Sequence, residues 1–106
     1  MPFFSQTNLV RKEPMEGFAG RFATGSTMTS VTWTVTAGAI LPEHAHPHEQ
    51  VAHVLEGEFE LTIGNETERL GPGTVAFIPP DVPHSGRALT ECRIIDVFHP
   101  VRDDYR

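Results

Sequence analysis

The chain has 106 residues, which is enough for one hydrophobic core and too few for two. Its net charge of −6 would be repelled by phosphate backbones and anionic lipid, so neither nucleic acid nor a membrane surface is an expected partner. The first ten residues lack the pattern of a secretory signal, and no stretch approaches the roughly 20 apolar residues of a membrane span, so we expect a cytoplasmic protein.

The regular patterns along the chain are those of β-strands. Residues 28–40 alternate threonine with Val31, Trp33 and Val35, the period of a half-buried strand. Similar runs, separated by glycine and proline turns, occupy residues 50–56, 58–64, 66–70, 74–80 and 91–99. No segment has a sustained helical period. We therefore predict an all-β fold, a small antiparallel jelly roll or barrel of about nine strands.

We treat residues 1–106 as a single domain, with the barrel core at about 28–99 and an N-terminal strand region at 1–27. Residues 56–70 are predicted to form two successive hairpins. The first turns at Gly57 and the second at Gly64–Asn65, where glycine tolerates positive φ.

The segment HAHPHEQ places His44, His46, His48 and Gln50 at every second position. If the segment is extended, these side chains share one face. Imidazole nitrogens and an amide oxygen suit a divalent first-row metal such as Zn, Ni, Mn, Fe or Cu. His84 follows three closely spaced prolines that would present it rigidly, so it is a candidate for a further ligand. The alternative is a polar loop whose histidines bind nothing.

A carboxylate also lies within an apolar strand. In the run 91–99, Asp96 and Phe98 share one face, and an unpaired carboxylate among apolar neighbours is costly. Asp96 is therefore either functional or part of a structural ion pair with Arg93 or Arg102. Arg102 itself lies in a charged tail, where such residues are usually solvated.

The remaining notable residues are predicted to be structural. Trp33 is interpreted as core packing, and the single cysteine, Cys92, as a buried, reduced side chain. His53 has the opposite strand parity to Gln50 and should face outward, while His99 should lie on the surface.

Two spaced motifs resemble those of the cupins. The first is Gly38-x5-His44-x-His46-x3-Gln50-x6-Gly57, and the second is Gly73-x5-Pro79-x-Asp81-x2-His84. The resemblance implies a cupin-type double-stranded β-helix and a metal held by His44, His46, Gln50 and His84. A register using His46 and His48 would leave a spacer shorter than the family's, so His48 is placed behind the ligands or at the mouth.

The sequence departs from the cupin pattern at three positions. Gln50 stands where many cupins have glutamate, Asp81 where glycine is usual, and Ala88 where asparagine is usual. A neutral glutamine leaves more of the metal's positive charge available, which favours an anionic substrate.

The chain also resembles the KdgF-like cupins of pectin and alginate breakdown, which convert 4,5-unsaturated uronates to linear 5-keto-4-deoxyuronate. This resemblance implies that Asp96 moves protons, Arg102 binds the substrate carboxylate and Phe98 walls the pocket. Small cupins also commonly form homodimers, and residues 3–13 are a candidate edge strand for one. The alternatives are a metal-dependent dioxygenase or other lyase, and a non-catalytic cupin that binds a metal or sugar.

Overall fold

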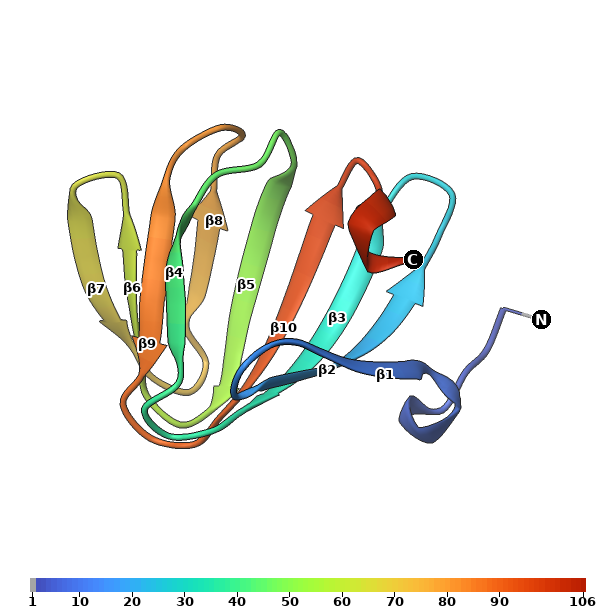
Figure 1. Cartoon of the computed structure of the whole chain (residues 1–106), viewed down its shortest axis with the longest axis horizontal. Coiled ribbons are helices and arrows are strands. Elements are labelled where there is room, and N and C mark those ends of the chain that lie inside the picture. The colour runs from blue at the N-terminus through green and yellow to red at the C-terminus, as the bar shows by residue number, and fades with distance from the viewer. Residues whose placement is uncertain (1) are drawn as a thin grey trace.

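Two antiparallel sheets face each other across a shared interior in this computed structural model, which describes residues 2–106 (Figure 1). The six-stranded sheet contains, in spatial order, β1 (Val10–Met15), β2 (Phe18–Thr24), β3 (Thr29–Val35), β10 (Cys92–His99), β5 (Glu49–Glu56) and β8 (Val75–Ile78). The four-stranded sheet contains β4 (Ile40–His44), β9 (His84–Ala88), β6 (Phe59–Ile63) and β7 (Glu66–Leu70). The predicted all-β, antiparallel architecture is confirmed.

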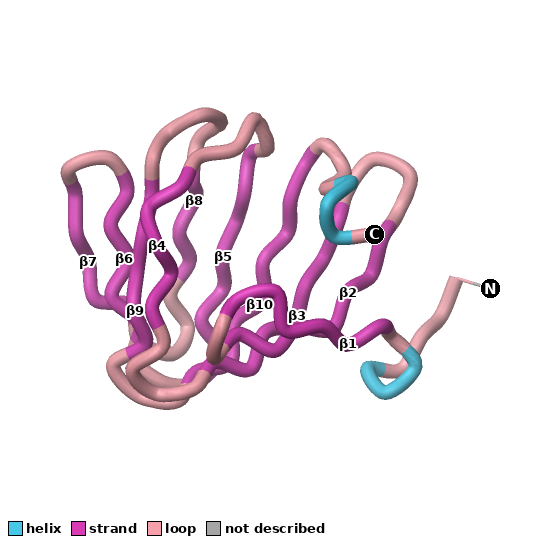
Figure 2. The backbone as a smooth tube through the Cα atoms, in the orientation of Figure 1, coloured by secondary structure: helices cyan, strands magenta, loops and turns pink. Residues whose placement is uncertain are grey.

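Helical structure in residues 2–106 is limited to two short 3-10 turns near the termini, η1 (Gln6–Asn8) and η2 (Asp103–Tyr105), as Figure 2 shows. Within the same residues, no helix is long and apolar enough to cross a membrane.

Alternating burial along the central strands builds the core between the two sheets. In β3, Val31, Trp33 and Val35 are buried, as their period-two pattern predicts. In β10, Asp96 and Phe98 point to the same interior. β2 adds Phe18 and Phe22 to the core, so the sheet extends into the N-terminal strand region predicted at residues 1–27. A carboxylate therefore lies on the core face of a central strand.

The predicted strand at 28–40 is two strands. β3 ends at Val35 and β4 begins at Ile40, and the two belong to different sheets. Gly38, between them, has φ of +85°, a conformation that disfavours other residues. Short-range alternation cannot reveal such a crossing, because it does not show which neighbouring strand each residue pairs with.

One of the two predicted hairpins is present. β6 and β7 pair across Gly64–Asn65, and Gly64 has φ of +60°. The hairpin at Gly57 is wrong, because β5 pairs with β8 and β10 whereas β6 pairs with β7 and β9. Gly57 instead carries the chain from one sheet to the other. A Cβ at this glycine would collide with the carbonyl oxygen of Glu91.

The histidine-rich segment also crosses between the sheets. β4 ends at His44 in the four-stranded sheet, and β5 begins at Glu49 in the six-stranded sheet. The segment is therefore not extended from His44 to Gln50, and the condition for one shared face is not met. Residues 45–48 form a connecting loop, so His44 and Gln50 approach the interior from opposite sheets.

Candidate functional site

Three histidines converge at one end of the interior. His44 ends β4 and is the direct register partner of His84, which begins β9, and His46 lies on the loop that leads to β5. The His44 and His84 ring centroids are 4.2 Å apart, and the His46 and His84 centroids are 4.8 Å apart. One ring nitrogen from each histidine lies within 4.8 Å of the others. The fold thus brings together the three histidines that the cupin resemblance implies as ligands.

Each histidine is held so that its Nε2 atom is the nitrogen with the free lone pair. Every ring places Nδ1 near a backbone carbonyl oxygen two residues away. The distances are 2.8 Å from His44 to Pro42, 3.1 Å from His46 to His48, and 3.0 Å from His84 to Val82. A carbonyl oxygen only accepts, so Nδ1 must be the donor. Such carbonyl contacts are the usual means of orienting metal-ligating histidines.

The polar atoms at this point fit a bound cation. Nε2 of His84 is buried and has no hydrogen-bond partner among residues 2–106. Nε2 of His46 lies 3.2 Å from Oε1 of Gln50, so two electron-pair acceptors face each other. A divalent first-row metal would satisfy all of these atoms, and its ligands would come from both sheets.

The environment favours the neutral forms of His46 and His84, which metal ligation requires. Burial lowers the pKa of His84 to about 4, and the positive charge of Arg102 acts in the same direction. Burial and Arg102 also lower the pKa of His46. His48 lies outside the three-histidine cluster and contributes its carbonyl oxygen to His46, so the geometry matches the favoured register.

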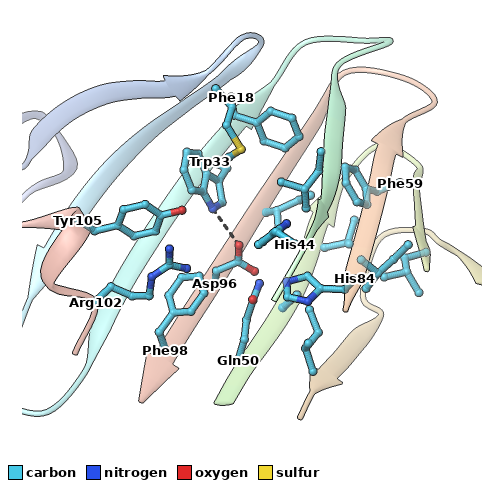
Figure 3. Close-up of a pocket in the computed structure, with 18 residues that line it drawn as sticks. Phe18, Trp33, His44, Gln50, Phe59, His84, Asp96, Phe98, Arg102 and Tyr105 are labelled. Atoms are coloured by element: carbon cyan, nitrogen blue, oxygen red, sulfur yellow. Dashed lines mark hydrogen bonds between the residues drawn. The ribbon is translucent and has the colours of Figure 1, made fainter. Parts of the chain in front are cut away.

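Asp96 lies beside this cluster, buried on β10 (Figure 3). The indole N–H of Trp33 donates to Oδ2 of Asp96 at 2.9 Å, whereas Oδ1 has no hydrogen-bond partner in the described chain. Burial raises the pKa of Asp96 to about 6, against the opposing effects of Gln50, Trp33 and Arg102. The carboxyl group of Asp96 can therefore gain or lose a proton near neutral pH.

The structure does not contain the ion pairs considered for Asp96. Arg93 is exposed on the outer face of β10, and Arg102 pairs with Asp104 instead. Trp33 is a core residue, as predicted, but its hydrogen bond to Asp96 was not foreseen. Trp33 is directly opposite Ile94, so Asp96 is its diagonal neighbour on the same face. The hydrogen bond between Trp33 and Asp96 could be identified only from the register of β3 and β10.

Arg102 is buried rather than solvated. Its guanidinium carbon lies 4.8 Å from the ring centroid of Phe98 and 4.1 Å from that of Tyr105. Its Nε and Nη2 donate to the Asp104 carboxylate at 3.0 and 2.6 Å. The two stacked rings and the paired carboxylate hold the cation in place. Asp104 and Tyr105 were missed from the sequence because the charged tail resembles a solvated terminus.

These side chains line one cavity of about 50 Å³. Its polar lining comes from His44, Gln50, His84, Asp96 and Arg102. Its apolar walls include Trp33, Phe98 and Tyr105. The cavity thus combines candidate metal ligands, a proton-exchanging carboxyl group and a guanidinium, while the three assigned catalytic roles remain predictions.

Apart from Trp33, the residues predicted to be structural, namely His53, His99 and Cys92, do not line this cavity. His53 and His99 are exposed. Cys92 is buried, its thiol donates to the carbonyl of Glu58 at 3.3 Å, and burial raises its pKa.

Comparisons with known proteins agree with this architecture. Two solved structures match nearly the whole chain: an RmlC-like cupin from Shewanella frigidimarina and KdgF from Halomonas sp.. The first is 28% identical with a TM-score of 0.93, covering 100% of this chain and 96% of that one. The second is 29% identical with a TM-score of 0.90, covering 98% of this chain and 97% of that one.

A curated relative also has a named activity. Dimethylsulfoniopropionate lyase DddQ from Ruegeria pomeroyi is 39% identical over 72 residues, which are 67% of this chain and 35% of the lyase. The match thus spans about a third of that relative's length. The family model of the cupin domain matches residues 31–98, more than half of the chain. With the double-stranded β-helix and both motifs in place, the chain belongs to the cupin family.

Proposed function

We propose that this cupin converts 4,5-unsaturated uronates, from pectin or alginate, to linear 5-keto-4-deoxyuronate with the help of a divalent metal. The observation that carries the proposal is the shared cavity, where Asp96 and Arg102 lie beside the histidine and glutamine cluster. The structural similarity to KdgF over nearly the whole chain supports it.

In this proposal the metal is held by His44, His46, Gln50 and His84. When bound, it supplies Lewis-acid polarisation of a substrate oxygen. All four ligands are neutral, so the site keeps a net positive charge that favours an anionic sugar acid.

Asp96 moves the proton. In the reaction a proton leaves the C1 hydroxyl as the bond between C1 and the ring oxygen breaks, and a proton is added at C4 as the resulting enol becomes a ketone. The reaction is an isomerisation, so no oxidant is needed. A carboxyl group with a pKa of about 6 can accept the first proton and return it, and such help contributes about 10²–10⁴-fold. Oδ1 is the exchanging oxygen, since Oδ2 is bonded to Trp33.

Arg102 and Phe98 bind and orient the substrate. The guanidinium attracts the C6 carboxylate, which fixes the sugar relative to Asp96. Phe98 supports the guanidinium from one side and forms an apolar wall of the cavity.

The direct test follows the absorbance of the conjugated alkene in 4,5-unsaturated galacturonate mixed with metal-loaded protein. We expect its loss to exceed the spontaneous rate, and to depend on metal and on His84. His84→Ala is compared with His53→Ala, which changes an exposed histidine outside the cluster. No acceleration with any of several divalent metals would refute the proposal.

A second candidate is a lyase reaction, favoured by the sequence identity with DddQ. Dimethylsulfoniopropionate contains a carboxylate, which Arg102 could pair with, and a sulfonium cation, which suits an aromatic wall. Incubation of the metal-loaded protein with this compound tests the lyase directly. Oxygen uptake tests a dioxygenase, and ligand binding without turnover would indicate a binding module.

Two further expectations are proposals about the whole protein, namely a cytoplasmic location and a homodimer. β1 is an edge of the six-stranded sheet and is therefore available for pairing with a second copy. Light scattering of the purified chain measures its oligomeric state.

A further inference from the structure

The cavity is too small for a sugar acid in the conformation described. Its volume of about 50 Å³ has room for an ion and a few water molecules, because roughly 10–15 Å³ of such space holds one water. Pockets that enclose small organic ligands are typically about 300–1,000 Å³. One wall must therefore move before a six-carbon substrate can bind.

The wall with the fewest backbone hydrogen bonds to the sheets is the C-terminal segment 103–106, whose Tyr105 ring packs against Phe22, Trp33 and Phe98. The last backbone N–H that donates to a strand residue is that of Arg102, which donates to Oγ1 of Thr29 at 2.9 Å. Beyond it, the backbone N–H groups of Tyr105 and Arg106 donate only within the segment, to Arg102 and Asp103. Most of the other walls are side chains on strands that pair with neighbours on both sides. We therefore expect segment 103–106 to move by rotation of the backbone at Arg102.

Side-chain hydrogen bonds and a cation–π contact hold this segment over the cavity. Asp104 accepts two hydrogen bonds from Arg102, and the Tyr105 ring stacks on the same guanidinium. Lys12 adds a hydrogen bond from Nζ to the carbonyl of Arg106 at 2.6 Å. The Arg102 side chain is 11% exposed and that of Asp104 is 58% exposed, so the carboxylate lies on the solvent side of the pair.

We propose that Asp104 is a specificity residue that occupies the carboxylate position of Arg102 until an anionic ligand displaces it. The incoming carboxylate replaces the paired hydrogen bonds of Asp104, and segment 103–106 with Tyr105 moves off the cavity. A neutral ligand cannot replace the carboxylate that Arg102 loses when Asp104 moves away. It therefore does not displace segment 103–106 from the cavity. This inference rests on the proposed function in that it concerns anionic substrates of the same site.

The test measures binding rather than turnover, with D-galacturonate as the anionic probe and D-galactose as its neutral counterpart. Titration calorimetry, with zinc and with chelator, compares the wild type with Asp104→Asn and Asp104→Ala. Asp103→Asn is the matched control, because Asp103 lies on the same turn but pairs with Arg106. We expect both Asp104 variants to bind galacturonate roughly two- to fivefold more tightly, as for loss of a competing, partly exposed ion pair. Galactose binding and the control should not change.

A second signal reports the movement itself. The chain has a single tryptophan, and the Trp33 ring centroid lies 6.1 Å from that of Tyr105. Galacturonate should therefore shift Trp33 emission in the wild type, and Asp104→Asn should show part of this shift without ligand.

The outcomes separate this inference from the proposed reaction. Unchanged or weaker galacturonate binding in both Asp104 variants, or no binding by any form of the protein, overturns the role of Asp104. Tighter binding by the variants supports it even if the wild type fails to open an unsaturated uronate, a failure that would count against the reaction alone.

Discussion

Trp33 and Asp96 are joined by a buried hydrogen bond of 2.9 Å between two neighbouring central strands, β3 and β10. The bond divides the carboxyl group into a held oxygen, Oδ2, and a free oxygen, Oδ1, that lacks a partner in the described chain. It also stabilises the charged form in an otherwise dehydrated position. Trp33 thus orients Asp96 and, together with Gln50, opposes the rise in its pKa that burial causes.

Trp33→Phe should raise the pKa of Asp96 above its value of about 6, because the donor that stabilises the carboxylate is removed. A hydrogen bond to a charged group contributes about 1.5–3 kcal/mol, which corresponds to a shift of roughly one pH unit or more. Carbon NMR of the labelled Asp96 carboxyl measures the shift without assuming any activity. An unchanged titration would show that Trp33 only packs against Asp96.

Two buried groups should give the metal-free protein opposite pH dependences of stability. The native pKa of His84, about 4, lies below the ordinary 6.5, so the unfolded state binds more protons and stability falls as pH drops from 6.5 to 4. The native pKa of Asp96, about 6, lies above the ordinary 3.8, so stability falls as pH rises from 3.8 to 6. Each pKa shift changes the free energy of unfolding by about 3 kcal/mol, and the two changes largely cancel.

Substituting one of these two residues should reveal the pH dependence of stability that the other contributes. In chelator, Asp96→Asn should gain stability steeply between pH 4 and 6.5, and His84→Gln should lose stability between pH 4 and 6. Urea unfolding at several pH values measures both. Parallel curves for the two variants and the wild type would contradict the assignment of these shifts to burial.

Metal affinity distinguishes the two registers of the histidine segment. His44→Ala should lower zinc affinity by at least about 100-fold, since it removes a direct ligand and loss of a residue that only orients a ligand already costs 10–100-fold. His48→Ala should have a much smaller effect, because His48 supports His46 through its backbone carbonyl, which alanine retains. Competition with a chromophoric chelator measures both constants. The reverse ranking would move the site to His46 and His48.

Asp81→Gly should stabilise the protein. Asp81 has φ of +65°, where an L side chain costs about 1–2 kcal/mol and aspartate somewhat less. Its N–H donates to the carbonyl of His46 at 2.8 Å, and glycine keeps this bond. We expect a gain of about 1 kcal/mol, or roughly 4–8 °C in Tm. An equal or lower Tm would indicate that the aspartate side chain contributes more than the backbone strain costs.

The sequence by itself determined the all-β fold, the cupin family and which residues of β10 face inward. Period-two alternation is a local property, so Asp96 and Phe98 could be placed on one face without any knowledge of neighbouring strands. The two motifs also identified the histidines that converge. The same local reasoning failed at the crossings, because it predicted a hairpin at Gly57 and could not show that the chain changes sheets between His44 and Gln50.

Only the tertiary structure decided which groups meet. His44 and Gln50 approach one point from different sheets, Trp33 reaches Asp96 through the register of β3 and β10, and Arg102 is enclosed between two rings. These contacts join residues far apart in sequence, and pairing between distant strands leaves no periodic signal in either one. The pairing of Arg102 with Asp104 is close in sequence, but its burial depends on Phe98 and Tyr105 forming a wall. The residue types of the site were local information, whereas its geometry was set by strand register and by where the chain crosses between sheets.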